Sequence, residues 1–177
     1  MTELSIGFPP VARSDARVLI LGSMPGVASL KASEYYAHTR NVFWQIMSGI
    51  TGVDAREAYA QRIAALKTSG IALWDVLQSC QRHGSLDADI EADTLKVNDF
   101  AAFFRQHRGI KHVCFNGATA ERYFTRYVLP ELSARSMRLL RLPSTSPAHA
   151  ALSFEQKRDT WRAALKPYRG SSIGCES

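Results

Sequence analysis

The sequence predicts an α/β protein with three layers, α/β/α, around a central, mainly parallel sheet of four strands. Two observations carry this prediction. Short apolar runs have the length and composition of buried strands, and amphipathic helical patterns separate them along the chain. The chain has 177 residues, of which 46% are apolar and 21% charged. It fits a single domain, 1–177, with its core at about residues 16–167 and with flexible termini.

The predicted strands cover residues 17–22, 70–76, 111–116 and 137–142. The first three (RVLILG, GIALWDV and KHVCFN) are almost continuously apolar, as expected of strands covered on both faces, whereas the fourth (MRLLRL) alternates more. Right-handed crossovers bring the carboxyl ends of parallel strands to one edge of the sheet, where ligands of such sheets bind. We therefore expect the loops after these strands to form the functional site.

Helical patterns occupy the intervals between the strands. Residues 42–50 build one apolar face, because large apolar side chains recur at helical spacing: Phe43, Ile46, Met47 and Ile50. Further helices are predicted at residues 54–67, 98–107 and 119–128, and from Ser153, where Gln156 gives the spacing of a capping box. The stretch 78–94 is predicted to be a polar loop long enough to be functional, and the tail 170–177 is expected to fray.

Positive charge is concentrated in the second half of the chain. Residues 1–100 have a net charge of −2, whereas residues 101–177 have a net charge of +8. A basic surface attracts polyanions by releasing their counterions, which favours a nucleic-acid partner. Taken by itself, the charge fits an ordinary solvated basic face equally well.

The cysteines Cys80, Cys114 and Cys175 form no C-x-x-C pair, which is unfavourable for a zinc site or an iron–sulfur cluster. We expect no metal and no cofactor. An odd number of cysteines fits reduced thiols, and the start of the chain lacks a signal-peptide pattern. No stretch approaches the apolar length of a membrane span, so we expect a cytoplasmic protein without a membrane partner.

The loop after the first predicted strand is Gly22-Ser23-Met24-Pro25-Gly26. Its glycines let a ligand approach the backbone, and Gly26 permits a positive φ. Backbone N–H groups of such a loop can face an anion. The loop is neither a Walker loop nor a dinucleotide fingerprint, and a simple tight turn is an equally good interpretation.

Residues 35–41 (YYAHTRN) combine aromatic rings with hydrogen-bonding groups. Tyr36 can stack on an unpaired base, while His38 and Arg40 can add polar contacts. Asn41 opens a predicted helix, and at that position the commonest structural role of an asparagine is that of an N-cap.

Polar groups also follow the other predicted strands. Asp75 ends a buried strand, so its carboxylate is either bonded to a loop N–H or a functional base. Asn116 offers a donor and an acceptor that can read a base edge, although the pair Asn116-Gly117 is also a turn former. The hydroxyl-rich loop 142–148 suits phosphate groups, and a plain surface loop is its alternative.

In this order, the motifs resemble those of the uracil-DNA glycosylase superfamily over roughly residues 16–165. GSMPG corresponds to the first motif of that superfamily, and LPSTSPA takes the place of its last motif, the loop that inserts into DNA. YYAHTRNVFW is similar to the aromatic and Asn-Phe-Trp segment of the mismatch-specific (Mug-like) branch. Together with GIALWDVLQSC, R-x-GSLDADI and FNG, these segments most resemble the hypoxanthine-DNA glycosylase (DNA-deoxyinosine glycosylase) group.

Two positions depart from the superfamily pattern. Met24 stands where much of the superfamily has Asp, Asn or Glu to position the attacking water, and it cannot activate water. Leu142 stands where the last motif often begins with His or Asn. The resemblance to the hypoxanthine group implies that Asn41 is the catalytic residue, and Asp75 is our second candidate for water activation.

The resemblance implies a monofunctional DNA glycosylase of base-excision repair. Such an enzyme hydrolyses the N-glycosidic bond of a deaminated base flipped out of DNA, here chiefly hypoxanthine in deoxyinosine. The alternatives are a uracil- or mismatch-specific glycosylase and a non-catalytic module of the same fold that binds nucleotides or damaged DNA. The expected partner is DNA containing deaminated bases, and the expected state is a monomer.

The predicted site residues fall into three sets. The catalytic set is Asn41 and Asp75. The base-binding set is Gly22, Ser23, Met24, Pro25, Gly26, Tyr36, His38 and Asn116. The DNA-binding set is Arg40, Arg141, Pro143, Ser144, Thr145, Ser146 and His149.

Overall fold

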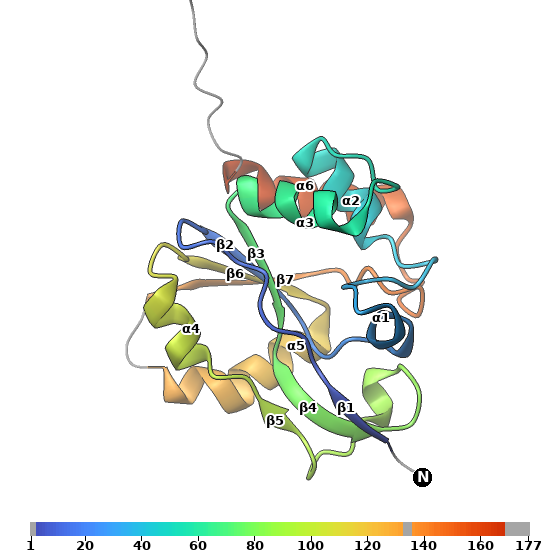
Figure 1. The fold of residues 1–177 in the computed structure, drawn as a ribbon, viewed down its shortest axis with the longest axis vertical. Helices are drawn as coiled ribbons and strands as arrows, with labels where there is room; N and C mark the ends of the chain where they lie inside the picture. Colours follow the sequence, from blue (N-terminus) through green and yellow to red (C-terminus); the bar gives the residue numbers. More distant parts are fainter. Residues whose placement is uncertain (1–2, 133–135, 169–177) are drawn as a thin grey trace, which may run out of the picture.

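The computed structural model describes residues 3–132 and 136–168. Its central sheet has four parallel strands in the order β3-β2-β6-β7. These are β2 (Val18–Gly22), β3 (Ile71–Asp75), β6 (His112–Asn116) and β7 (Arg138–Leu142). The four predicted strands are confirmed to within one residue at each end, and their carboxyl ends share one edge of the sheet (Figure 1).

Helices cover both faces of this sheet, which confirms the three-layer prediction (Figure 1). The apolar side chains of α2, α3 and α6 cluster with Val18 and Ile20 of β2 on one face. Those of α4 and α5 cluster with Leu19 and Leu21 on the other face, as the alternation of side chains along a strand requires. The helices are α1 (Val27–Ala32), α2 (Phe43–Thr51), α3 (Tyr59–Thr68), α4 (Phe100–Gln106), α5 (Ala118–Tyr123) and α6 (Phe154–Leu165).

The ends of two helices differ from the prediction. The helix expected over residues 54–67 begins at Tyr59, because the carboxylate of Asp54 instead accepts the N–H of Arg56 at 2.8 Å and closes a turn. The helix expected over residues 119–128 is α5 followed by a π-helical turn, η2 (Phe124–Val128). The described ranges also contain short 3-10 turns at η1 (Asp87–Asp89), η3 (Leu129–Glu131) and η4 (Lys166–Tyr168).

A second, antiparallel sheet was not predicted. It has three strands in the order β1-β4-β5, which are β1 (Glu3–Ile6), β4 (Leu77–Arg82) and β5 (Lys96–Val97). Part of the expected polar loop 78–94 is therefore a strand, and the N-terminal segment expected to be flexible contains another. The strand β4 was missed because its sequence, which includes QSCQR, is mostly polar. Its buried positions include an arginine, Arg82, as well as Cys80.

No helix within the described ranges, 3–132 and 136–168, is both long and apolar enough to cross a membrane. The tail 170–177, for which the sequence predicts fraying, lies outside these ranges, as does Cys175. Cys80 and Cys114 are both buried and carry free thiols.

The predicted capping box of α6 is confirmed and supports a test of stability. The hydroxyl of Ser153 accepts the N–H of Gln156 at 3.2 Å, and the Gln156 side chain accepts the N–H of Ser153 at 2.9 Å. We expect Ser153→Ala to lower the free energy of unfolding by about 1 kcal/mol in urea denaturation, because it removes a cap. Ser153→Asp, which keeps a capping oxygen, should retain most of that stability. An equal loss in both variants would show that the cap is not the cause.

Candidate active site

A cavity of about 640 Å³ opens at the carboxyl edge of the central sheet. Gly22, Asp75 and Asn116, which end β2, β3 and β6, all line it. Loop residues from 23–29, 35–41, 85–88 and 144–149 line the rest. The structure thus brings together the loops that the sequence placed after the strands.

Every residue of the predicted catalytic and base-binding sets lines this cavity. Of the predicted DNA-binding set, five residues line it as well: Arg40, Ser144, Thr145, Ser146 and His149. Arg141 and Pro143 lie outside the lining. The Arg141 guanidinium pairs with Glu121 at 3.0 Å, and the Pro143 carbonyl accepts the indole N–H of Trp161 at 2.9 Å. Their contact with DNA remains a prediction.

The loop after β2 is held by its carbonyl groups. Those of Gly22 and Ser23 accept the N–H groups of Val76 and Leu77 at 2.9 and 3.0 Å. The carbonyl of Pro25 accepts a hydrogen bond from the side chain of the buried arginine in β4. Three carbonyls of one short loop are therefore bonded to the strand and turn that continue from β3, and the loop has a fixed shape.

The N–H groups of the same loop are left for a ligand. Within the described part of the chain, those of Ser23, Met24 and Gly26 donate to no protein acceptor. This arrangement supports the prediction that the loop faces an anion or a carbonyl oxygen. Gly26 differs from the prediction, because its φ of −69° is open to any residue. The Met24 side chain is buried in the core, so it offers nothing to a reacting water.

The segment after β4 fastens this loop from the other side. Ser85 Oγ accepts the N–H of Val27 at 3.0 Å, and the Ser23 hydroxyl donates to Asp87 Oδ1 at 2.6 Å. Arg82 is 3% exposed, and its Nε and Nη1 atoms have no hydrogen-bond partner. Its positive charge opposes the rise in pKa that burial causes at Asp87. The sequence signal for these residues was the polar stretch 78–94, whose detailed roles the sequence left open.

Tyr36 is held in a strained conformation at the cavity. Its φ is +56°, a left-handed value that costs on the order of 1–3 kcal/mol in a residue with a side chain. Its ring stacks on Phe43, with 4.0 Å between the ring centroids. One face of Tyr36 is thus already covered by protein. The hydroxyl is buried. Burial, then the charge of Asp75, raises the pKa of Tyr36 against the opposing effect of the Asn116 amide.

Hydrogen bonds to the residues on either side of Tyr36 hold its backbone in that conformation. The N–H of Ala37 donates to Ser29 Oγ at 3.1 Å. The N–H of Tyr35 donates to the hydroxyl of Tyr59 at 3.1 Å, and its carbonyl accepts the indole N–H of Trp44 at 2.8 Å. Strained residues persist where their surroundings determine them in this way, and such residues gather at functional sites.

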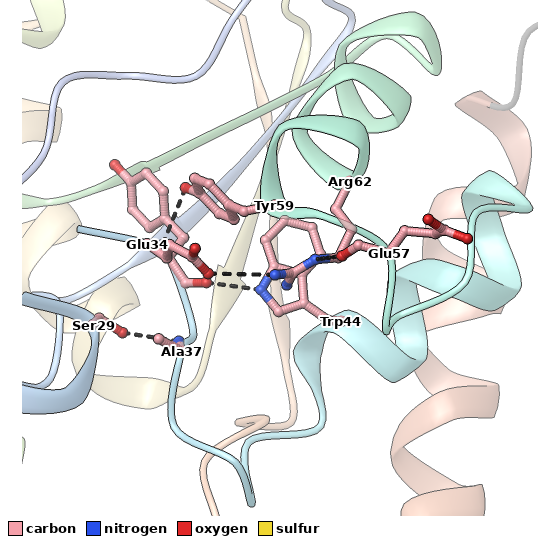
Figure 2. Close-up of polar contacts among 8 residues, drawn as sticks. Ser29, Glu34, Ala37, Trp44, Glu57, Tyr59 and Arg62 are labelled. Carbon is pink, nitrogen blue, oxygen red and sulfur yellow. Dashed lines mark hydrogen bonds and ion pairs between the residues drawn. The ribbon is translucent and has the colours of Figure 1, made fainter. Parts of the chain in front are cut away.

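Arg62 of α3 makes further contacts to the segment that carries Tyr36 (Figure 2). Its guanidinium pairs with Glu34 at 3.3 Å, donates to the carbonyl of Glu57 at 3.0 Å and lies 4.6 Å from the centre of the Trp44 ring. The loop that carries Tyr36 is thereby tied to the helical layer beside it. These contacts fix the position of Tyr36 beside the cavity.

Asn41 lies directly before the helix α2, but it is not the N-cap. The N-cap is Val42, and the Asn41 side chain accepts the N–H of Phe43 at 3.0 Å. The N-cap interpretation is therefore wrong by one residue, although the amide still serves the start of the helix. Its oxygen keeps a second lone pair, and Asn41 lines the cavity. Its backbone N–H donates to the carbonyl of His38 at 2.8 Å, which fixes the turn.

Asp75 presents a buried carboxyl group to the cavity. It is 3% exposed, and its Oδ2 atom has no hydrogen-bond partner. A Cβ atom on Gly22 would lie 2.4 Å from Asp75 Oδ1, so glycine is required for this close approach. Burial, and next the charge of Asp87, raises the pKa of Asp75 to about 8, against an opposing effect of Arg82. This shift favours the protonated form of the carboxyl group near neutral pH, and that form can donate a hydrogen bond.

Asn116 holds the loop on the opposite side of the cavity. Its Oδ1 accepts the N–H of Thr145 at 2.9 Å, and its Nδ2 donates to Thr145 Oγ1 at 2.9 Å. The carbonyl of Thr145 accepts the N–H of Val42 at 3.2 Å, so this loop is also joined to the start of α2. One lone pair of Asn116 remains for a base, and its other amide hydrogen faces the Tyr36 hydroxyl. Gly117 has a φ of +96°, which fits the turn-forming alternative for the pair Asn116-Gly117.

Helix α6 anchors the far end of that loop. Lys157 is buried, and its ammonium group donates to the carbonyls of His149 and Ser146 at 2.6 and 3.4 Å. Burial lowers the pKa of Lys157. These bonds join the loop to α6.

The described residues contain no group of three or more His, Cys, Asp or Glu side chains that could hold a metal ion. The polar groups at the cavity are amides, hydroxyls, backbone N–H groups, two histidines, the Arg40 guanidinium and the carboxyl groups of Asp75 and Asp87. Groups of this kind can hydrogen-bond a flat, polar ring.

Comparison with known proteins identifies the class to which this fold and cavity belong. The sequence profile of the Uracil DNA glycosylase superfamily matches residues 9–166. The chain therefore belongs to the uracil-DNA glycosylase superfamily, as its motifs predicted.

Two curated relatives refine this placement. A protein named hypoxanthine DNA glycosylase from Methanosarcina barkeri is 34% identical over 161 residues, which cover 90% of this chain and 97% of that protein. A protein of the same name from Methanosarcina acetivorans is 31% identical over 161 residues, which again cover 90% of this chain and 97% of that protein. The solution structure of a candidate uracil DNA glycosylase from M. acetivorans is similar with a TM-score of 0.79 and 30% identity, over 94% of this chain and 99% of that one. The predicted likeness to the hypoxanthine group is confirmed.

The protonated state of Asp75 leads to a prediction about pH and stability. Folding raises the pKa of Asp75 from the ordinary 3.8 to about 8. The contribution of this carboxyl group to the free energy of unfolding is therefore fully present below about pH 3.8. That contribution is lost as the pH rises through 8. We expect Asp75→Asn, which imitates the protonated form, to be stabilised relative to the wild type by up to about 1.4 kcal/mol for each pH unit in this window.

Urea denaturation at successive pH values from 5 to 8 measures this difference. Asp93→Asn, on the exposed surface, is the matched control and should follow the wild type at every pH. If the curves of Asp75→Asn and the wild type run parallel, the carboxyl group is ionised in the folded protein.

Proposed function

We propose that this protein is a monofunctional DNA glycosylase of base-excision repair that releases hypoxanthine from deoxyinosine. The observation that carries the proposal is the convergence of Asn41, Asp75 and the unbonded N–H groups of the 22–26 loop on one cavity. Membership of the superfamily supports the reaction class, and the names of the two relatives support the base.

In the proposed reaction, water adds its hydroxyl group to C1′ of the sugar while the bond from C1′ to N9 of the purine breaks. The electron pair of that bond leaves with the base, which takes up a proton. The products are an abasic site and free hypoxanthine. Asn41 is neutral, so it cannot remove a proton from water. Its second lone pair can orient the water, since the Phe43 N–H holds the amide in position.

Stabilisation of the departing base is the larger task. A purine that carries no positive charge before the glycosidic bond breaks leaves as an anion. The proposed donors are the N–H groups of Ser23, Met24 and Gly26 and the protonated carboxyl group of Asp75. Each is already in place and has no protein acceptor to give up. We therefore assign Asp75 to the leaving group and Asn41 to the water. Asn116 reads the polar edge of the ring with its remaining hydrogen-bonding capacity.

The damaged nucleotide must leave the base stack to reach this cavity, which costs a few kcal/mol and less for a mispaired base. The proposed DNA contacts are Arg40 and the hydroxyl groups of the 144–146 loop. We infer that the active form is a monomer and that it works in the cytoplasm. None of these groups is a lysine placed to form a Schiff base, so the proposal includes no lyase step.

The test is excision on labelled duplexes with a single deoxyinosine, deoxyuridine or deoxyxanthosine, followed by alkaline cleavage. We expect deoxyinosine to be cut fastest. Asn41→Ala should lower its excision on the order of a hundredfold or more while leaving the Kd for DNA nearly unchanged, because it removes a water-orienting group. Gln45→Ala, which removes an exposed amide from α2, is the matched control and should behave as the wild type.

Faster excision of uracil than of hypoxanthine would show that uracil, and not hypoxanthine, is the preferred base. DNA binding without excision of any of the three bases would favour a binding module. An equal loss of excision and binding in Asn41→Ala would show that Asn41 serves the fold alone.

A further inference from the structure

Arg82 is a buried arginine whose positive charge has no direct counter-ion. It ends the strand β4 and is 3% exposed. Within the described ranges its guanidinium forms no ion pair, and its Nε and Nη1 atoms have no hydrogen-bond partner. An apolar side chain of similar volume would serve the fold at least as well. The cost of burying this charge therefore indicates a role outside the stability of the fold.

The side chain of Arg82 makes one hydrogen bond to the described residues, and its acceptor is the carbonyl of Pro25. That carbonyl belongs to the same peptide group as the N–H of Gly26. In a trans peptide the C=O and the N–H point in opposite directions, so this N–H points away from Arg82. Gly26 lines the cavity, and its N–H donates to no acceptor in the described part of the chain. One peptide group thus lies between the buried guanidinium and the cavity.

The other peptide groups of the same loop are supported by neutral donors. The carbonyls of Gly22 and Ser23 accept backbone N–H groups at 2.9 and 3.0 Å. A hydrogen bond from a charged donor is stronger than one between neutral groups. Hydrogen bonds in a chain also polarise one another, so a bond at the carbonyl strengthens the N–H of the same peptide as a donor. The N–H of Gly26 therefore gains more from its support than those of Ser23 and Met24.

The charge of Arg82 also acts on the cavity through space. It opposes the rise in pKa at both Asp75 and Asp87, and both of these residues line the cavity. A buried charge is screened much less by salt and water than an exposed one. The field that favours the ionised form of these carboxyl groups also favours any other negative charge that arises in the cavity.

We propose that Arg82 is a positioning residue for base excision: it polarises the Pro25–Gly26 peptide, so that the N–H of Gly26 stabilises the negative charge that develops on the departing base. This inference rests on the proposed function, because it requires a base that leaves as an anion. Arg82 does not line the cavity, so it acts through the peptide and not by touching the substrate. Its charge is in place before the reaction and needs no rearrangement at the transition state.

Replacing the charge at nearly constant side-chain volume tests this role. Arg82→Met should lower the single-turnover rate of deoxyinosine excision on the order of tenfold or more, because it weakens a donor to the departing base. The Kd for the duplex should stay unchanged, and the free energy of unfolding should be unchanged or higher. Arg82→Lys keeps the positive charge and should retain most of the rate.

The matched control is Arg17→Met. Arg17 also donates to a backbone carbonyl, that of Tyr168 at 2.8 Å, but it directly precedes β2 and so lies at the opposite edge of the sheet. This variant should excise deoxyinosine at the rate of the wild type.

The departing base provides a readout that a merely structural role would not move. Fluorine at C2 of the hypoxanthine ring withdraws electrons, so the fluorinated base carries negative charge more easily and needs less stabilisation. The rate loss caused by Arg82→Met should therefore be smaller on fluorinated deoxyinosine than on deoxyinosine. A variant that only disturbs the shape of the loop would lower both rates by the same factor.

A second measurement needs no catalysis. In protein whose glycines carry an NMR-active nitrogen isotope, the amide signal of Gly26 should shift in Arg82→Met and stay close to the wild-type position in Arg82→Lys and Arg17→Met. Gly26→Ala assigns the signal by its loss. This substitution is sterically allowed, because its Cβ would lie 3.6 Å from the nearest atoms, which belong to Ser85.

A wild-type excision rate in Arg82→Met would overturn the proposal, and so would equal rate losses on the two substrates. A rate loss without a shift of the Gly26 signal would also overturn it, since Arg82 would then not act through this peptide. Failure of the wild type to excise any base would overturn the proposed function and, with it, the role of Arg82 in excision. The Gly26 signal decides separately whether Arg82 polarises the peptide.

Discussion

The site depends on the parallel pairing of β2 with β3, which sets Gly22 directly beside Asp75. A glycine is needed there, because a Cβ atom would lie 2.4 Å from the Asp75 carboxyl oxygen and 3.1 Å from the Tyr36 hydroxyl. This single close approach brings a backbone loop, a buried acid and an aromatic ring to one point. Burial of the acid then favours its protonated form near neutral pH, and that form is a donor.

The second sheet gives the loop its orientation. Arg82 is buried beneath the loop and bonds the Pro25 carbonyl, while the 85–87 segment bonds Ser23 and Val27. Since the carbonyl groups are bonded to the protein, the N–H groups are left to the cavity. A buried guanidinium with two unbonded nitrogens is costly, so Arg82 stabilises a functional geometry rather than the fold alone.

Much of the fold follows from patterns that are local in the sequence. Continuous apolar runs specify the four buried strands, and Ser153 with Gln156 specifies the start of α6. The antiparallel sheet escaped prediction because its strands are short and polar, and because β1 and β4 are paired over a long separation in sequence. Strand alternation carries little information where the inward residues are Cys80 and Arg82.

By itself, the sequence determined the order of the strands along the chain, the loops that end them and the superfamily to which they belong. Those properties depend on residue type and on neighbours along the chain. Tertiary structure alone decided that the pKa of Asp75 is raised, that Asn116 shares its amide with Thr145, and that Leu142 is buried while Leu86 is exposed. The reason is physical: protonation, hydrogen-bond partners and exposure depend on what surrounds a side chain, and distant segments provide those surroundings.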